Sequence, residues 1–140
     1  GVTAIDSWAF SDCDKLSHVV IPAGVTEIGS SAFGYCSSLE KVQLPSTIVE
    51  ISTHAFQGCI NLKDINLPEG ILSIPELCFS DCKSLTQINI PSTVLEIGVW
   101  AFKGCSSLQS VNLNSVSSID LYAFEDCVNL KSIVIYKRRF

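Results

Sequence analysis

Residues 55–68 read Ala-Phe-Gln-Gly-Cys-Ile-Asn-Leu-Lys-Asp-Ile-Asn-Leu-Pro, and this pattern recurs along the whole chain. Phe, Cys and Leu follow one another at intervals of three residues in six copies, whose Phe residues are Phe10, Phe33, Phe56, Phe79, Phe102 and Phe124. The copies are 23 residues apart, except that the last is one residue shorter. Self-similarity at such a period predicts a solenoid, in which each repeat packs only against its neighbours.

The first part of each repeat is predicted to be a short helical turn around the Phe. The position that opens it holds Asp, Ser or Gly in most copies, and these residues suit a helix N-cap. The position before the Cys is mostly Gly or Asp, which tolerate the left-handed conformation that ends a helix. Tyr35 fits that position poorly.

The rest of each repeat is predicted to be extended. In residues 39–44, polar side chains alternate with the apolar Val42 and Leu44, as in a half-buried strand. A Pro follows this segment in four copies, and it would stop the strand there. A second apolar pair, such as Ile48 and Ile51, then faces the core from the far side, as a short extended segment. Strands related by a fixed period must be parallel.

Composition narrows the class of protein. The 140 residues suffice for one domain, and the net charge of −5 argues against nucleic-acid or anionic-membrane partners, which need a basic face. No stretch approaches the ~20 apolar residues of a membrane span. The two His residues lie in different repeat columns, and neither lies near a patterned nucleophile. No phosphate loop, cofactor motif or metal-ligand spacing occurs, so we expect a protein that is not an enzyme.

Seven Cys residues occur, and six of them share one column of the repeat. Equivalent residues of neighbouring turns stack at about the ~4.8 Å strand spacing, so we expect a ladder of buried free thiols. Neighbouring thiols would approach disulfide distance, but parallel Cβ directions disfavour the bond. Cys78 replaces an Ala in a small buried column, which favours packing over zinc binding with Cys82.

The repeat also resembles a known family. The unit Leu-x-x-[Val/Ile]-x-[Leu/Ile], the Pro after it, and stretches such as residues 97–105 (Ile-Gly-Val-Trp-Ala-Phe-Lys-Gly-Cys) are similar to the BspA-like, Treponema-type leucine-rich repeat. The resemblance covers essentially the whole chain. It implies one domain over residues 1–140: an α/β solenoid, a right-handed coil of six repeats, with a parallel sheet on one face and short helical turns and loops on the other.

The same resemblance implies a function. The family is known mainly from cell-surface and secreted proteins, several of which are adhesins that bind host matrix proteins or other cells. We therefore expect a non-catalytic module that recognises a protein, with a glycan as the alternative ligand, and that works without a cofactor at the cell surface or after secretion. The alternative is an intracellular structural scaffold in the cytoplasm, and seven unpaired Cys residues fit either a reducing interior or an anaerobic cell surface.

The candidate ligand-binding residues lie in exposed columns. Two columns on the strand face supply His18, Lys41, Asp64 and Gln87, and then Gln43, Asn66, Asn89 and Asn112. A column on the turn face supplies Trp8, Trp100 and Tyr122, since large exposed aromatic side chains are typical anchors of an interface. The structural alternatives are that the Asn and Gln side chains bond one another along the sheet, and that the aromatic rings cover the neighbouring turn.

Neither end of the chain shows the polar cap that a solenoid needs for solubility. We therefore expect a fragment of a longer array, or ends that dock on flanking repeats or on a second copy, with Tyr136 and Phe140 as contacts.

Overall fold

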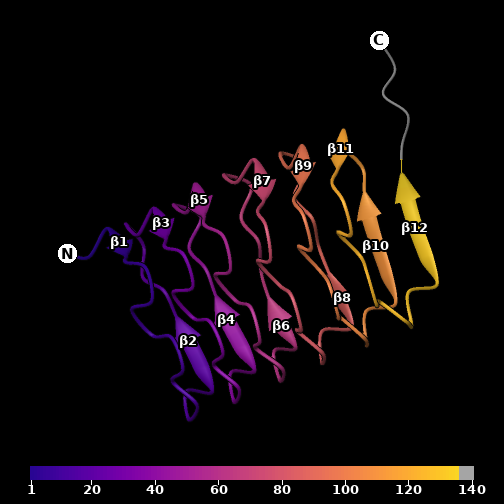
Figure 1. Cartoon of the computed structure of the whole chain (residues 1–140). Coiled ribbons are helices and arrows are strands. Elements are labelled where there is room, and N and C mark those ends of the chain that lie inside the picture. The colour runs from indigo at the N-terminus through magenta and orange to yellow at the C-terminus, as the bar shows by residue number, and fades with distance from the viewer. Residues whose placement is uncertain (136–140) are drawn as a thin grey trace.

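The structure is a computed structural model that describes residues 1–135, and it shows a β-solenoid of about six turns, of the right-handed type (Figure 1). Each turn holds two short strands. The strands are β1 (Ala4–Ile5), β2 (His18–Val20), β3 (Glu27–Ile28), β4 (Lys41–Gln43), β5 (Glu50–Ile51), β6 (Asp64–Ile65), β7 (Ser73–Ile74), β8 (Gln87–Ile88), β9 (Glu96–Ile97), β10 (Ser110–Leu113), β11 (Ser118–Ile119) and β12 (Ser132–Ile135).

The strands form two rows on two sides of the coil (Figure 1). The even-numbered strands, which we call the even-strand face, pair in parallel as β2-β4-β6 and β12-β10-β8. The odd-numbered strands and the residues beside them (3–7, 26–30, 49–53, 72–76, 95–99 and 117–121) form the odd-strand face, paired as β1-β3-β5 and β11-β9-β7. The predicted parallel strands and the second extended segment are thus confirmed. The prediction of a sheet on one side only is wrong.

The predicted helical turns are also wrong, since residues 1–135 contain no helix. In residues 6–13 and their equivalents in the other repeats, every second backbone N–H donates to the next turn, as Trp8 does to the Ser30 carbonyl at 2.9 Å. The N–H groups between them bond three residues back, as Ala9 does to Asp6. A helix needs all these donors for itself. The segment is therefore a chain of tight turns that adds a third ladder of bonds between repeats.

Left-handed backbone makes these turns possible. The residue before the Ala, or before Cys78 in the fourth turn, takes a φ between 54° and 63° in all six turns, although it is Trp, Ser, His, Leu or Tyr. The residue before the Cys also has a positive φ, between 58° and 73°, and Tyr35 has a φ of 58° despite its poor fit to the pattern. Such a conformation costs a non-glycine residue about 1–2 kcal/mol. The hydrogen bonds between turns offset this cost at each repeat.

The core consists of stacked columns of identical residues. Successive Phe rings lie nearly parallel with centroids 5.3–5.6 Å apart, and Phe33, Phe56, Phe79 and Phe102 are fully buried. The Leu, Ile and Cys columns surround them. Burial of each large apolar side chain stabilises the fold by about 1.5–3 kcal/mol. Because a side chain is covered by its counterparts in the turns before and after it, stability depends on stacking.

The strand ladders are interrupted between the third and fourth turns. Among the described strands, β5 is not paired with β7, nor β6 with β8. On the odd-strand face, Pro75 stands at a position that supplies a hydrogen bond between turns at the other junctions. At the other junctions, the residue equivalent to Pro75 donates its backbone N–H to the Ile carbonyl of the preceding turn, as Ser52 does to Ile28 and Gly98 to Ile74. Pro has no N–H to give. On the even-strand face, β6 and β8 contain no Pro, so every residue of these two strands has a backbone N–H.

The first and last described turns expose residues of the core columns. Phe10 is 41% exposed and Ile133 is 43% exposed, because each has a neighbouring turn on one side only. Tyr136, Phe140 and the basic stretch of residues 137–139 lie outside the described residues. Docking of the ends therefore stays a prediction.

Candidate functional site

The even-strand face carries two parallel columns of outward side chains, one on each side of the buried Val and Ile column. Strand alternation turns these side chains to solvent. All eight strand-face candidates are exposed: His18, Lys41, Gln43, Asp64, Asn66, Gln87, Asn89 and Asn112. The register of the sheets aligns them from turn to turn, with His18 opposite Lys41 and Lys41 opposite Asp64.

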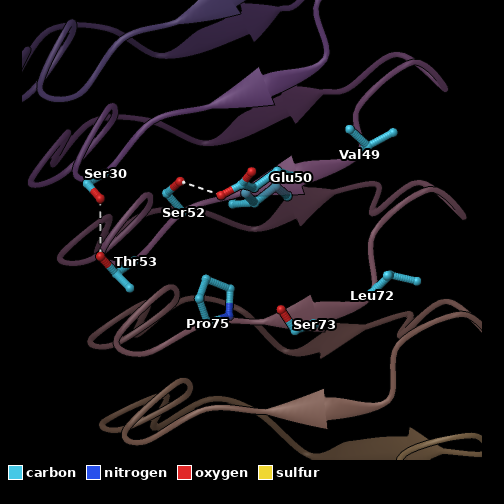
Figure 2. A pocket seen from close by; sticks show the side chains of 9 residues that line it. Ser30, Val49, Glu50, Ser52, Thr53, Leu72, Ser73 and Pro75 are labelled. Carbon is cyan, nitrogen blue, oxygen red and sulfur yellow. Dashed lines mark hydrogen bonds between the residues drawn. The ribbon is translucent and has the colours of Figure 1, made fainter.

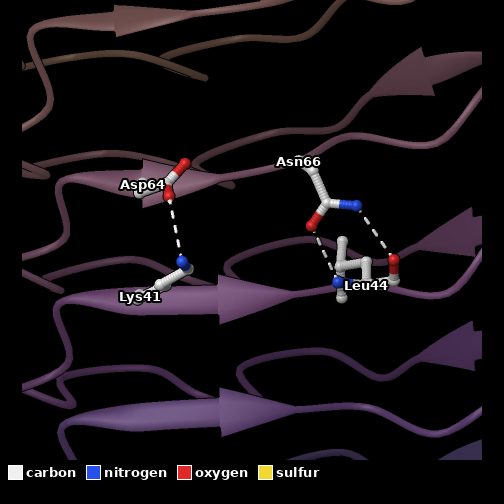
Figure 3. A network of polar contacts seen from close by, with 4 residues as sticks. All are labelled: Lys41, Leu44, Asp64 and Asn66. Atoms are coloured by element: carbon white, nitrogen blue, oxygen red, sulfur yellow. Dashed lines mark hydrogen bonds and ion pairs between the residues drawn. The ribbon is translucent and has the colours of Figure 1, made fainter.

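In the first half of this face, formed by β2, β4 and β6, two of the candidates interact with each other. The ammonium group of Lys41 lies 3.8 Å from the Asp64 carboxylate (Figure 3), and both side chains are substantially exposed. Such a surface ion pair contributes at most about 1 kcal/mol. His18 lies beside the Ser17 hydroxyl, with Nδ1 at 3.1 Å. A ligand would meet here a cation and an anion that already neutralise each other.

The Asn66 side chain has a structural role. Its Oδ1 accepts from the Leu44 N–H and its Nδ2 donates to the Leu44 carbonyl, both at 2.9 Å (Figure 3). The amide thus replaces a backbone pair at the edge of the β4–β6 sheet. The structural alternative therefore predicted correctly that the Asn66 side chain bonds within the protein, but it predicted the wrong partner. The amide bonds the neighbouring backbone and not another amide side chain.

The second half of this face, formed by β8, β10 and β12, carries amide side chains that are available to a ligand. Within the described part of the chain, the side chains of Gln87, Asn89 and Asn112 have no hydrogen-bond partner in the protein, and neither has Gln43 in the first half. Each amide offers two donors and an acceptor to a ligand. Ser110 lies directly opposite Gln87 and adds an exposed hydroxyl. This half of the face therefore presents several unused polar groups in one plane.

The aromatic candidates divide into two groups. Trp100 stacks on Tyr122 of the next turn at 6.1 Å, and its Nε1 donates to Glu125 at 3.0 Å. Lys103 lies 5.6 Å from the centroid of the Trp100 ring. Trp100 therefore covers the neighbouring turn, which is the structural alternative. Trp8 stands apart at the other end of the coil, where its column continues with Ser31, and it is 66% exposed.

The odd-strand face contains a cavity of about 410 Å³ that the sequence pattern did not reveal. It lies at the interruption between β5 and β7, with Glu50, Ser52 and Pro75 along it and Val49 and Leu72 at one side (Figure 2). One signal for this cavity in the sequence is Pro75, because the equivalent residues of the other turns have a backbone N–H that can donate a hydrogen bond. A second signal was the pairing of two adjacent apolar residues, such as Ile48-Val49, of which one has to face outward.

The thiols form the predicted ladder of free cysteines. Five are buried, and the Sγ of each ladder Cys after the first donates to the Phe carbonyl of the preceding turn at 3.1–3.3 Å. Burial raises the pKa of the Cys36 and Cys127 thiols to about 11 and that of Cys59 to about 12. Burial also raises the pKa of Cys78, Cys82 and Cys105. Thiols held protonated in this way are poor nucleophiles.

Two further features of residues 1–135 bear on function. No three or more His, Cys, Asp or Glu side chains in this range are close enough together to hold a metal ion. The same range contains no helix with the length and apolar character of a membrane span.

Comparison with solved structures supports the repeat architecture. The chain is similar to the Treponema pallidum leucine-rich repeat protein TpLRR, with 38% identity and a TM-score of 0.85, over 93% of this chain and 62% of that one. It is similar to a leucine-rich repeat protein of Bacteroides ovatus, with 33% identity and a TM-score of 0.81, over 84% of this chain and 33% of that one. The chain thus spans less than two thirds of either protein.

A third similarity shows the fold alone. The pneumococcal vaccine antigen PcpA is 21% identical, with a TM-score of 0.69, over 96% of this chain and 42% of that one. A comparison with curated proteins gave no match. Six copies of the BspA type leucine rich repeat region match residues 3–131. The chain is therefore a repeat protein of the protein-interaction type, and it belongs to the BspA-type leucine-rich repeat family.

Proposed function

We propose that this chain is the ligand-binding part of a cell-surface adhesin that binds a host matrix protein or a protein on another cell. Family membership supports the non-catalytic, protein-binding part of the proposal, because these repeats typically bind other proteins and have no shared catalytic residues. The cell-surface setting and the host partner rest on the resemblance to surface proteins and are proposals.

The observation that carries the proposal is the row of unused polar groups in the second half of the even-strand face. Gln87, Asn89 and Asn112 are exposed and have no partner among the described residues. Gln87 and Asn112 stand on strands held in register and Asn89 directly follows β8, so the loss of freedom on binding is small. Amide side chains suit the polar, adaptable contacts of a protein surface or a glycan.

The test is binding of the purified protein to immobilised fibronectin and fibrinogen, followed by variants of the face. We expect Asn89→Ala combined with Asn112→Ala to weaken binding about tenfold, because each lost hydrogen bond contributes about 0.5–1.5 kcal/mol. Asn114→Ala is the matched control, since Asn114 is equally an exposed Asn but follows β10 and lies off this face. Equal affinities for the double variant and the control would refute the assigned surface.

A second candidate function is an intracellular scaffold built from the same repeats. The free thiol ladder favours it, because a reducing compartment preserves unpaired thiols. The two functions differ in where the protein is found. Location in intact cells therefore separates them more directly than binding does.

A further inference from the structure

The odd-strand face carries an exposed apolar stripe. Val49, Leu72 and Leu95 occupy the same position in three successive turns and are 56%, 63% and 38% exposed. The N–H of Leu95 donates to the Leu72 carbonyl at 2.9 Å, so these two turns are held side by side. Val49 and Leu72 both border the cavity at Pro75 (Figure 2). An aligned apolar row beside a hollow is typical of a surface that binds a partner.

The hollow continues along the solenoid. A second cavity of about 360 Å³ shares Ser73 and Pro75 with the first and reaches Glu96 and Asp120 in the following turns. Together the two cavities form a shallow groove across the odd-strand face, from the second turn to the last described one. A groove of this shape fits an extended segment better than a compact small molecule.

The charge of this face is of one sign. The odd-strand face contains Asp6, Glu27, Glu50, Glu76, Glu96 and Asp120, and no Lys or Arg. Glu27 and Glu50 are directly opposite each other in paired strands, an arrangement that is unfavourable for like charges. Within the described chain the Glu50 carboxylate has one hydrogen-bond donor, the Ser52 hydroxyl at 3.4 Å (Figure 2). A cation supplied from outside would relieve this repulsion.

We propose that the odd-strand face is a second docking surface, separate from the even-strand face, and that its occupant is an extended protein segment carrying Lys or Arg beside apolar side chains. The apolar side chains contact Val49, Leu72 and Leu95, and the cations meet Glu27, Glu50 and Glu96. Charge complementarity selects this class of partner. Nucleic acids and anionic bilayers are excluded, since both would be repelled by the acidic row.

The test uses the whole chain and a synthetic peptide in which Lys and Val alternate. We expect this peptide to bind, and to bind more weakly at ~1 M than at ~0.1 M salt, because salt screens the charges. A peptide in which Glu replaces Lys, and one in which Ser replaces Val, should both fail to bind. If the Lys-Ser peptide binds equally well, the attraction is non-specific and the proposed apolar contact is refuted.

Two variants place the site. Combining Glu27→Gln, Glu50→Gln and Glu96→Gln should weaken binding of the Lys-Val peptide about tenfold, as expected for three surface charge pairs. Leu72→Ser should weaken it as well, with little effect on folding, because Leu72 is exposed. Glu40→Gln, an exposed carboxylate of the even-strand side, and Val128→Ser, 75% exposed in another part of the turn, are the controls. Affinity unchanged by the triple variant or by Leu72→Ser, or lost equally in the controls, would overturn the proposal.

Discussion

The Sγ of Cys59 lies 3.1 Å from the carbonyl oxygen of Phe33 in the preceding turn and donates a hydrogen bond to it. The same carbonyl accepts the N–H of Cys36, so this one acceptor closes the tight turn within its own repeat and also binds the Cys side chain of the next repeat. This double use explains why the position is a Cys. The side chain has to be small and apolar, and it has to reach one carbonyl acceptor.

Replacing Cys59 with Ala is expected to destabilise the fold by about 1–2 kcal/mol, through the lost contact volume and the lost hydrogen bond. Urea unfolding followed by circular dichroism measures this. Cys13→Ala is the matched control, because Cys13 lies in the first turn, has no earlier Phe to bond and is only half-buried. Equal costs at the two positions would mean that the bond between turns contributes nothing.

Stability is expected to fall as the pH rises above 9. The ordinary thiol pKa is 9.0, and burial raises the pKa of Cys59 to about 12. Between these values the unfolded chain has lost a proton that the folded chain keeps, so the free energy of unfolding falls with pH. The slope for one such thiol reaches about 1.4 kcal/mol per pH unit.

Below pH 9 both states keep the proton, and this dependence disappears. Urea unfolding of the wild type and of Cys59→Ala at several pH values isolates the contribution of this thiol, because other groups that titrate in this range are common to both proteins. The variant should show the shallower slope above pH 9. Identical slopes would show that the folded thiol ionises as readily as the unfolded one.

Gly58 is expected to be required by Tyr35. A Cβ added at Gly58 would overlap the Tyr35 ring of the preceding turn, and Gly58 also has a φ of 73°. Gly58→Ala should cost about 1–2 kcal/mol for the left-handed backbone, plus the displacement of the ring. The total should fall when Tyr35→Ala is combined with it, as a double-mutant cycle measures.

Gly24→Ala provides the control for this cycle. Gly24 also has a positive φ, of 100°, but a Cβ there would meet no atom within 4 Å. Its cost should be independent of Tyr35→Ala. Coupling of the same size at both glycines would show that the ring overlap is not the cause.

Pro75 is expected to set the interruption on the odd-strand face. Ser52→Pro should open a second interruption, because it removes the N–H that donates to the Ile28 carbonyl at 2.9 Å, at a cost of about 1–3 kcal/mol. The reverse change, Pro75→Ser, should give the new amide at position 75 a slow hydrogen exchange comparable to that of the Ser52 amide. Rapid exchange at position 75 would mean that another feature keeps β5 and β7 apart.

The repeat columns allowed most of the fold to be predicted. Val42, Leu44 and the Phe and Cys columns of the inner turns are buried as expected, because alternation and a fixed period state directly which residues share a side. The helical turns could not be excluded in the same way. Asp6, Ala9 and Phe10 are compatible with a capped helical turn, and nothing in their identity shows that the N–H groups of Trp8 and Phe10 bond the next turn.

The candidate site was predictable only as far as exposure. The pattern placed Asn66, Asn89 and Asn112 in one exposed column, yet Asn66 is bound to the backbone of Leu44 and the other two are free. The interruption between β6 and β8, a property of stacking and not of either strand, separates Asn89 from the turn before it, whereas Asn112 is free although β8 and β10 are paired. The cavity at Pro75 was missed for a similar reason, since its effect is a bond absent from the neighbouring turn.

The most direct test of the adhesin proposal is the location of the protein in intact cells of its source organism. An antibody raised against the purified chain is applied to intact cells and to permeabilised cells, with an antibody to a cytoplasmic protein as the control for leakage. An adhesin requires labelling of the intact cells, and loss of that labelling after brief external protease treatment. Labelling that appears only after permeabilisation would contradict the adhesin proposal and favour the intracellular scaffold.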